Sequence, residues 1–193
     1  MELREKYKLT EVGLIPDDWK LRSIQSLIDD TEILEHIDGN HGELYPRSNE
    51  FVEDGIPYIS ATDFVSGTVK FNGCKYLTAE RCERFQKGIA KNGDILFAHN
   101  ATVGPVAFLE TQFEFIILST TATLFRVDNE RLLNQYLRYA LQAAGFVKQY
   151  QAVMSQSTRF QVPITTQRKF KIPIPPTKAE QTAIATALSE MDN

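Results

Sequence analysis

The chain has few residues of the kinds that form cross-links or span membranes. Its 193 residues include two cysteines, Cys74 and Cys82, which fits a reduced cytoplasmic protein better than a disulfide-bonded one. The longest apolar runs, such as residues 115–118, fall far short of the roughly 18 residues of a membrane helix. Residues 1–6 contain no apolar core of a secretion signal. The sequence therefore predicts a globular cytoplasmic protein with no disulfide framework and no membrane span.

The motifs of common catalytic sites are also absent. The sequence contains no phosphate loop, no dinucleotide fingerprint and no His-Glu-x-x-His zinc motif. It lacks the Asn/Asp-Pro-Pro-aromatic tetrad of amino-methyltransferases and the Glu-x-Lys of nuclease cores. The histidines and cysteines form no zinc-binding pattern. We therefore predict no catalytic residues, no metal and no cofactor.

Acidic residues are missing from one long stretch of the chain. The net charge is −4, yet residues 131–179 contain no Asp or Glu. The bases of this stretch are Arg131, Arg138, Lys148, Arg159, Arg168, Lys169, Lys171 and Lys178. They could form an electropositive face for nucleic acid, or they could be scattered around a helix and a strand and simply be solvated.

Hydrophobic periodicity predicts a mixed fold. Alternating apolar residues and interspersed glycines indicate strands at 56–59, 68–71, 94–98, 103–109, 115–118 and 121–127. Helical spacing indicates helices near 19–28, 78–86 and 132–144, with a further piece from 146. We interpret residues 29–38 as a solvated acidic stretch and residues 38–55 and 155–159 as polar loops. The fold class is α+β, a twisted and mostly antiparallel sheet with flanking helices.

The C-terminal segment is predicted to be a separate helix. Pro175 and Pro176 form a stiff hinge, and Thr177 with Glu180 makes a capping box. The apolar stripe of Ile184, Leu188 and Met191 is typical of a coiled-coil seam. This divides the chain into residues 1–174 and a hinge and helix at 175–193. The alternative is that the helix folds back onto its own domain.

Several stretches in fixed order resemble the specificity subunit of type I restriction-modification enzymes. The first two stretches are residues 8–19 and Gly55-Ile-Pro-Tyr-Ile-Ser60 with Asp63. The next two are Lys91-Asn-Gly-Asp-Ile-Leu-Phe97 and Leu118-Ser-Thr-Thr121. The strongest stretches are Ser157-Thr-Arg-Phe-Gln161, Ile172-Pro-Ile-Pro-Pro176 and Ala179-Glu-Gln181 with Ile184-Ala185. Together they cover nearly the whole chain.

The resemblance implies a non-catalytic DNA-recognition protein. Residues 1–174 would be a target recognition domain that reads one half of a split site in double-stranded DNA. The C-terminal helix would space two such domains and bind the methyltransferase subunit and, through it, the restriction subunit. A full subunit of this family carries two domains and two helices, so this chain resembles half of one. A homodimer through Ile184, Leu188 and Met191 would restore the symmetry.

Candidate DNA contacts lie mainly in the predicted loops, because loops carry most binding residues. Many members of the family have an Arg-Gly pair after the Gly-Asp-Ile-Leu strand, where this chain reads His99-Asn100-Ala101-Thr102. The candidate base readers are Asn40, His41, Tyr45, Arg47, Ser48, Asn49, His99, Asn100, Gln156 and Arg159. The candidate phosphate contacts are Lys75, Arg84, Lys87, Ser157, Thr158 and Lys169. The alternative function is a protein-interaction module for a partner helix, favoured by the acidic stretch at 29–38 and the open seam.

Overall fold

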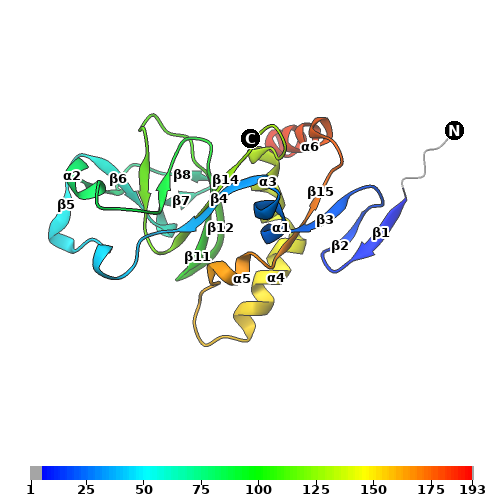
Figure 1. The fold of residues 1–193 in the computed structure, drawn as a ribbon, viewed down its shortest axis with the longest axis horizontal. Coiled ribbons are helices and arrows are strands. Elements are labelled where there is room, and N and C mark those ends of the chain that lie inside the picture. Colours follow the sequence, from blue (N-terminus) through cyan, green and yellow to red (C-terminus); the bar gives the residue numbers. More distant parts are fainter. Residues whose placement is uncertain (1–5, 193) are drawn as a thin grey trace.

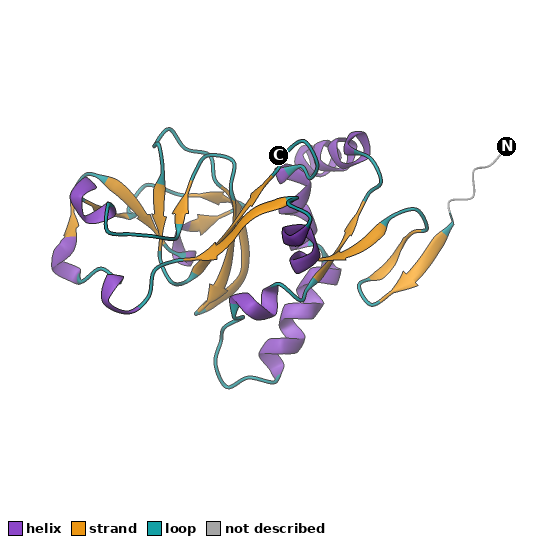
Figure 2. Ribbon diagram, in the orientation of Figure 1, coloured by secondary structure: helices purple, strands orange, loops and turns teal. Residues whose placement is uncertain are grey.

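Two β-sheets and a group of helices build the protein (Figures 1 and 2). The computed structural model describes residues 6–192, so most of the segment considered for a secretion signal lies outside the described residues. No described helix has the length and apolar character needed to cross a membrane. The sheets are mostly antiparallel and the helices gather beside the larger sheet, so the predicted α+β class is confirmed.

The larger sheet has six strands and carries the centre of the fold. Its strand order is β4 (Ile33–Asp38), β14 (Ala122–Val127), β11 (Ile95–Asn100), β12 (Thr102–Phe108), β8 (Thr68–Val69) and β7 (Phe64–Val65). All neighbours are antiparallel except β12 and β8. The central strand β11 is buried over residues 95–99, which explains why its sequence is almost continuously apolar.

The smaller sheet lies at the end of the molecule marked β5 and β6 in Figure 1. Its order is β10 (Ile89–Ala90), β13 (Ile116–Leu118), β6 (Ile56–Ile59), β9 (Lys75–Leu77) and β5 (Phe51–Val52). Short helical turns lie in the segments that connect the strands: η1 (Gly42–Leu44), η2 (Ser48–Glu50), η3 (Ala61–Asp63) and α2 (Ala79–Cys82). Thr78 caps α2 by accepting a hydrogen bond from the Arg81 amide, as expected of a helix N-cap.

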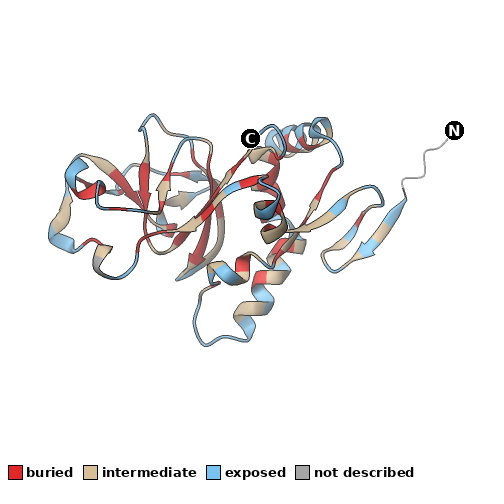
Figure 3. Cartoon of the chain, in the orientation of Figure 1, coloured by how far each residue is buried: buried red, intermediate tan, exposed pale blue. Residues whose placement is uncertain are grey.

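The helices pack on the side of the six-stranded sheet away from the five-stranded sheet, and they share the main core with it (Figure 3). They are α1 (Ile24–Asp29), α3 (Asn134–Gln142), α4 (Ala144–Ser155), α5 (Ile164–Gln167) and α6 (Lys178–Met191). Aromatic rings of the sheet and helices meet here, with Phe97 and Phe146 at a centroid distance of 5.7 Å. Two strand pairs complete the fold: β3 (Lys20–Ser23) with β15 (Lys171–Ile174), and β1 (Tyr7–Thr10) with β2 (Gly13–Pro16).

Two local predictions were wrong because distant strands pair with the segments concerned. Residues 20–23 form β3 rather than the start of a helix, since they bond to β15 near the other end of the chain. The stretch at 29–38 is not simply solvated, because residues 33–38 form β4 at the edge of the six-stranded sheet. Ile33 and His36 of β4 are buried, and Glu35 pairs with Arg126 of β14.

The C-terminal helix α6 also differs from its prediction, because it folds back onto its own domain. The Gln181 side chain is 2 % exposed, and its Oε1 accepts a hydrogen bond of 2.9 Å from the Leu133 amide. Ile184 packs against the main core, whereas Met191 at the end of the stripe is 81 % exposed. Ile184 and Met191 are therefore not equally exposed along the predicted stripe, and the division of the chain at residue 174 stays a prediction.

Candidate nucleic-acid interface

The turn between β11 and β12 is bonded to the loop between α4 and α5, far along the chain. The Val162 amide donates to the His99 carbonyl at 2.8 Å, and the Ala101 amide donates to the Phe160 carbonyl at 3.0 Å. Asn100 and Gln161 form an isolated antiparallel bridge. We call the surface made by residues 99–102 and 156–161 the hairpin–loop edge. It brings together two groups of candidate readers that the sequence places far apart.

The α4–α5 loop presents polar and aromatic side chains along this edge. Gln156, Ser157, Thr158 and Arg159 are all exposed, as predicted for DNA contacts. The Ser157 hydroxyl accepts a hydrogen bond of 3.1 Å from the Arg159 amide, which holds the loop backbone in place. Phe160 follows with 68 % of its surface exposed, although its backbone is fixed. An aromatic ring held this way is available to a ligand.

His99 differs from the other candidates of this edge because its ring is only 6 % exposed. Its Nδ1 lies 2.8 Å from the Thr123 hydroxyl, which in turn lies 3.1 Å from the Gln167 amide nitrogen. The Gln167 carbonyl oxygen is 3.1 Å from Nε2 of His36. Burial lowers the pKa of both histidines to about 4, so both rings are neutral at pH 7. A buried polar chain therefore runs behind the hairpin–loop edge.

The loop after β4 starts next to this edge, since Asp38 pairs with Thr123, whose hydroxyl is bonded to His99 Nδ1. The Asp38 carboxylate accepts bonds from Lys87 Nζ at 2.5 Å and from His41 Nε2 at 2.8 Å. Burial acts to raise the pKa of Asp38, but these two hydrogen bonds hold it below its usual value. The charge of Lys87 is thus largely neutralised within the protein.

Asn40, in the same loop, is placed inside rather than on the surface. It is 2 % exposed, and its amide donates to the Lys87 carbonyl. The structure therefore gives Asn40 a structural role that the sequence analysis did not foresee. The adjoining backbone is pressed against the sheet, because a Cβ added to Gly39 would lie 2.1 Å from the Ser119 carbonyl oxygen.

A second group of candidates surrounds the five-stranded sheet. Tyr45 and Lys75 line a pocket of about 270 Å³ together with Ser60, Ser119 and Tyr58. The Tyr58 hydroxyl is buried and has no partner among the described residues, and burial raises its pKa. Ser119 and Thr121 lie between this pocket and the hairpin–loop edge, since the His99 amide donates to the Thr121 carbonyl at 3.0 Å.

The remaining candidates, Arg47, Ser48, Asn49 and Arg84, are exposed near α2 and η2. Asn49 and Arg84 line a hollow of about 340 Å³. Neighbouring Arg81 is not available to a ligand, because it is buried and paired with Glu50 at 2.5 Å. These four residues are not bonded to the hairpin–loop edge by any contact between described residues.

The bases of the acid-free stretch do not act as one face. Three of them pair with acids from other parts of the chain: Arg138 with Asp192, Lys171 with Glu11 and Lys178 with Glu130. Arg131 donates to the Asp30 carbonyl on the far side of the helices. By contrast, Arg159 and Lys169 are exposed beside α5, and the Arg168 guanidinium rests against His36. The exposed bases of this stretch that form no ion pair among the described residues therefore include Arg159 and Lys169 near the α4–α5 loop and α5, and Lys148 on α4.

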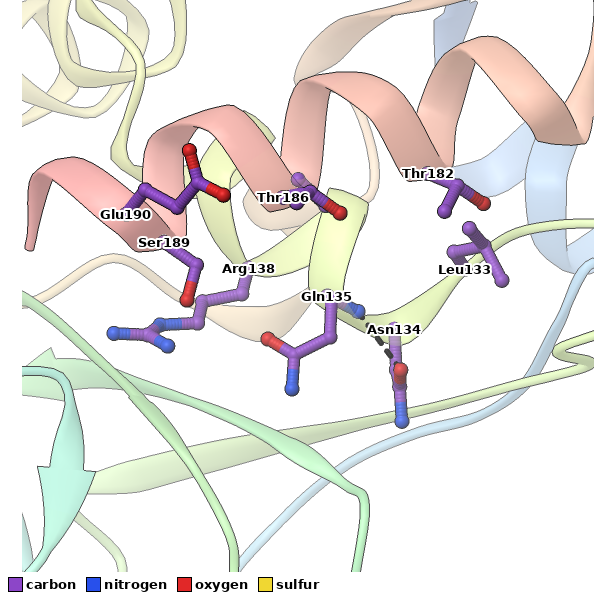
Figure 4. A pocket seen from close by; sticks show the side chains of 9 residues that line it. Leu133, Asn134, Gln135, Arg138, Thr182, Thr186, Ser189 and Glu190 are labelled. Atoms are coloured by element: carbon purple, nitrogen blue, oxygen red, sulfur yellow. Dashed lines mark hydrogen bonds between the residues drawn. The ribbon is translucent and has the colours of Figure 1, made fainter.

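A hollow of about 490 Å³ lies between helices α3 and α6 (Figure 4). Gln135 and Arg138 project from α3, and Thr182, Thr186 and Glu190 from α6. The lining mixes polar side chains with the apolar Leu133 and Ala185, whereas the seam predicted for this helix is apolar.

Within residues 6–192, no group of three His, Cys, Asp or Glu side chains could hold a metal ion. Cys74 and Cys82 are free thiols, and both are buried, as interpreted from the sequence.

Three residues at or behind the edge are absent from the candidates predicted from the sequence: Phe160 on the edge, and Thr123 and Gln167 in the buried polar chain. Phe160 stands within the Ser157–Gln161 motif, so a search for aromatic residues among polar loop residues could have found it. Thr123 and Gln167 carry no such signal, because their importance depends on strands and helices that meet only in the folded chain.

Solved structures share this α+β fold. A chain from a study of complex assembly and conformational transition of the type I R-M system superposes with a TM-score of 0.66 at 18% identity, covering 92% of this chain and 39% of that one. The HsdS subunit from Thermoanaerobacter tengcongensis gives a TM-score of 0.64 at 18% identity, covering 91% of this chain and 38% of that one. The fold is thus that of known specificity-subunit chains.

The sequence comparison gives the family itself. Residues 16–193 match the model of the type I restriction modification DNA specificity domain, so the chain belongs to that family. The MjaVIII specificity subunit of a type I restriction enzyme from Methanocaldococcus jannaschii is 24% identical over 98% of this chain and 43% of its own length. The chain spans less than half of the curated relatives it matches. The predicted resemblance to a specificity subunit is confirmed.

Proposed function

We propose that this chain recognises a sequence in double-stranded DNA through the hairpin–loop edge and the adjoining loop at 38–49. The observation that carries the proposal is that exposed polar side chains and basic side chains without an ion pair among the described residues lie together at this edge. The chain also belongs to a DNA specificity family. Phosphate contacts from Arg159 and Lys169 would set the position of the protein on the duplex. The loop side chains would then read base edges.

The first test is the salt dependence of binding. We expect the purified chain to bind a fluorescent random duplex weakly. About four to six phosphate contacts give a log–log slope of roughly −4 to −5 against salt concentration. Fluorescence anisotropy measured over a range of salt concentrations gives that slope. Binding that ignores salt, or no binding at low salt, contradicts the proposal.

The second test compares two arginines of the acid-free stretch. Arg159→Ala is expected to lower DNA affinity by about 1–3 kcal/mol, as for a base contact or a bidentate phosphate contact. Arg131→Ala is the matched control, because Arg131 is also exposed but bonds to Asp30 and Thr31 at the end of α1, outside the hairpin–loop edge. Equal losses in both variants, or unfolding of Arg159→Ala, contradict a role for Arg159 in reading DNA.

The partners of the chain are also a proposal, supported by its family. The chain would work with a methyltransferase subunit and, through it, a restriction subunit, without catalysing a reaction itself. Pairing of two copies through α6 remains an alternative way to assemble two reading domains. Size-exclusion chromatography of the chain alone and with a co-expressed methyltransferase subunit distinguishes these two assemblies.

The two observations that favoured a module for a partner helix, the acidic stretch and the open seam, no longer support that alternative. The acidic stretch is largely taken up by β4, and Ile184 of the predicted seam is packed against the chain's own core. We therefore keep DNA recognition as the proposed function.

A further inference from the structure

In the buried polar chain behind the hairpin–loop edge, the donor and the acceptor of each hydrogen bond can be assigned in turn. It contains Arg168, His36, Gln167, Thr123 and His99, and the last four are at most 6 % exposed. Buried polar groups of this kind are almost always hydrogen-bonded. A histidine ring nitrogen can donate or accept, so the partners decide which nitrogen carries the proton.

The direction is set first at Gln167. Its side-chain nitrogen lies 2.9 Å from the Val162 carbonyl, which can only accept a hydrogen bond. The amide NH₂ therefore faces Val162 and Thr123, and the carbonyl oxygen faces His36. His36 must then donate from Nε2, which leaves its Nδ1 as an acceptor. The Arg168 Nε–H group points at this Nδ1 from 3.4 Å, in agreement with that assignment.

The same reasoning fixes His99. The Thr123 oxygen accepts a hydrogen bond from the Gln167 NH₂ group at 3.1 Å, and Thr123 is fully buried. Its own hydroxyl proton needs an acceptor, and His99 Nδ1 at 2.8 Å is the one described beside it. Nδ1 therefore accepts, and the proton of the neutral ring is on Nε2.

The Nε2 atom of His99 is the free end of the chain of hydrogen bonds. It has no partner among the described residues, and it is not one of the buried atoms left without a partner. His99 as a whole keeps 6 % of its surface exposed, and it lies on a strand whose next residues, Asn100–Thr102, form the hairpin turn.

We propose that the buried chain holds His99 as a fixed hydrogen-bond donor that selects an acceptor atom on a DNA base edge. This inference rests on the proposed function and deepens it by naming the chemistry that His99 reads. In the major groove, a single donor matches N7 or O6 of guanine, N7 of adenine or O4 of thymine, and it disfavours the amino group of cytosine. Thr123, Gln167 and His36 are positioning residues, because they act through His99. A phosphate oxygen is an acceptor too, so the experiment must separate the two sources.

The tautomer is measured first, on the full chain without DNA. Nitrogen-15 spectra of histidine-labelled protein are expected to give a protonated Nε2 and an unprotonated Nδ1 for both His36 and His99. In Thr123→Val the isosteric side chain has no hydroxyl, so His99 is expected to populate both tautomers while His36 is unchanged. Thr123→Ser is the matched control and should restore the single tautomer. If the spectrum of the wild-type protein shows the His99 proton on Nδ1, the inference is overturned without any variant.

The reading is measured second, by selecting bound sequences from a random duplex library with each of the three proteins. We expect Thr123→Val to lose about tenfold discrimination at one base pair, and Thr123→Ser to keep it. A uniform loss of affinity with the same preferred sequence assigns the donor to a phosphate and overturns base reading. An unchanged preference and affinity also overturns it. Failure of the wild type to bind any duplex refutes the proposed function, whereas an unexpected tautomer with intact binding refutes only this inference.

Discussion

Acidification should destabilise the fold through the two buried histidines. Burial lowers the pKa of His36 and His99 from 6.5 to about 4. Between these values the unfolded chain binds more protons than the folded chain, so stability is full above pH 6.5 and falls as the pH drops through the window. One pKa unit corresponds to about 1.36 kcal/mol, so going from pH 7.5 to 5.5 removes about 1.3 kcal/mol per ring and about 2.6 kcal/mol in total.

The assay is urea unfolding at both pH values, followed by the fluorescence of the single tryptophan, Trp19. This residue is a suitable reporter, because its indole N–H donates to Glu180 of α6 and its ring packs on Tyr136 of α3. His41→Asn is the matched control, since His41 is exposed and outside the buried chain. We expect it to keep the full loss of stability. Equal stability of the wild type at both pH values refutes the buried, neutral state of the two rings.

Three further substitutions test other parts of the account. Phe160→Ala is expected to lower duplex affinity by about 1–3 kcal/mol if the ring stacks on a base, whereas Phe113→Ala, an exposed ring on another loop, should have no effect in the same anisotropy assay. Ile184→Asp is expected to lower the free energy of unfolding by about 2 kcal/mol or more, because it places an unpaired carboxylate beside the core. Met191→Asp should leave the free energy of unfolding unchanged. Equal effects of the two substitutions would contradict the packing of Ile184 against the core. Gly39→Ala is expected to cost about 1–3 kcal/mol in urea unfolding, because its Cβ would overlap the Ser119 carbonyl, and a neutral result would contradict that close contact.

Local patterns in the sequence were enough to predict much of the fold. The strands at 56–59, 95–100 and 122–127 were predicted within a few residues, because their apolar runs and flanking glycines are local signals. β3 and β4 were missed because charged residues interrupt their apolar ones, and each is a strand only through a partner about a hundred residues away or more. The position of α6 was likewise decided by Gln181 and Ile184 meeting α3 and the core, which no spacing within the helix reveals.

The candidate interface was predictable to a similar extent. The exposed loop residues Gln156–Arg159 follow from polarity and from the family motif, and the structure adds that they are bonded to the β11–β12 turn. Asn40 shows the limit of the method, because a polar residue in a predicted loop can be buried and bonded to backbone. Thr123 and Gln167 show the opposite case, in which buried polar residues orient a residue at the surface.

The most direct test of the central claim is to map where DNA touches the chain. A photo-cross-linking side chain is introduced at Thr158 of the hairpin–loop edge and, in a separate protein, at Ala187, which is exposed on α6. Each protein is irradiated with a labelled duplex at low salt, and the adducts are separated by denaturing electrophoresis. The account predicts DNA adducts from position 158 that fall as salt is raised, and none from position 187. Adducts from position 187 with none from position 158 would contradict it.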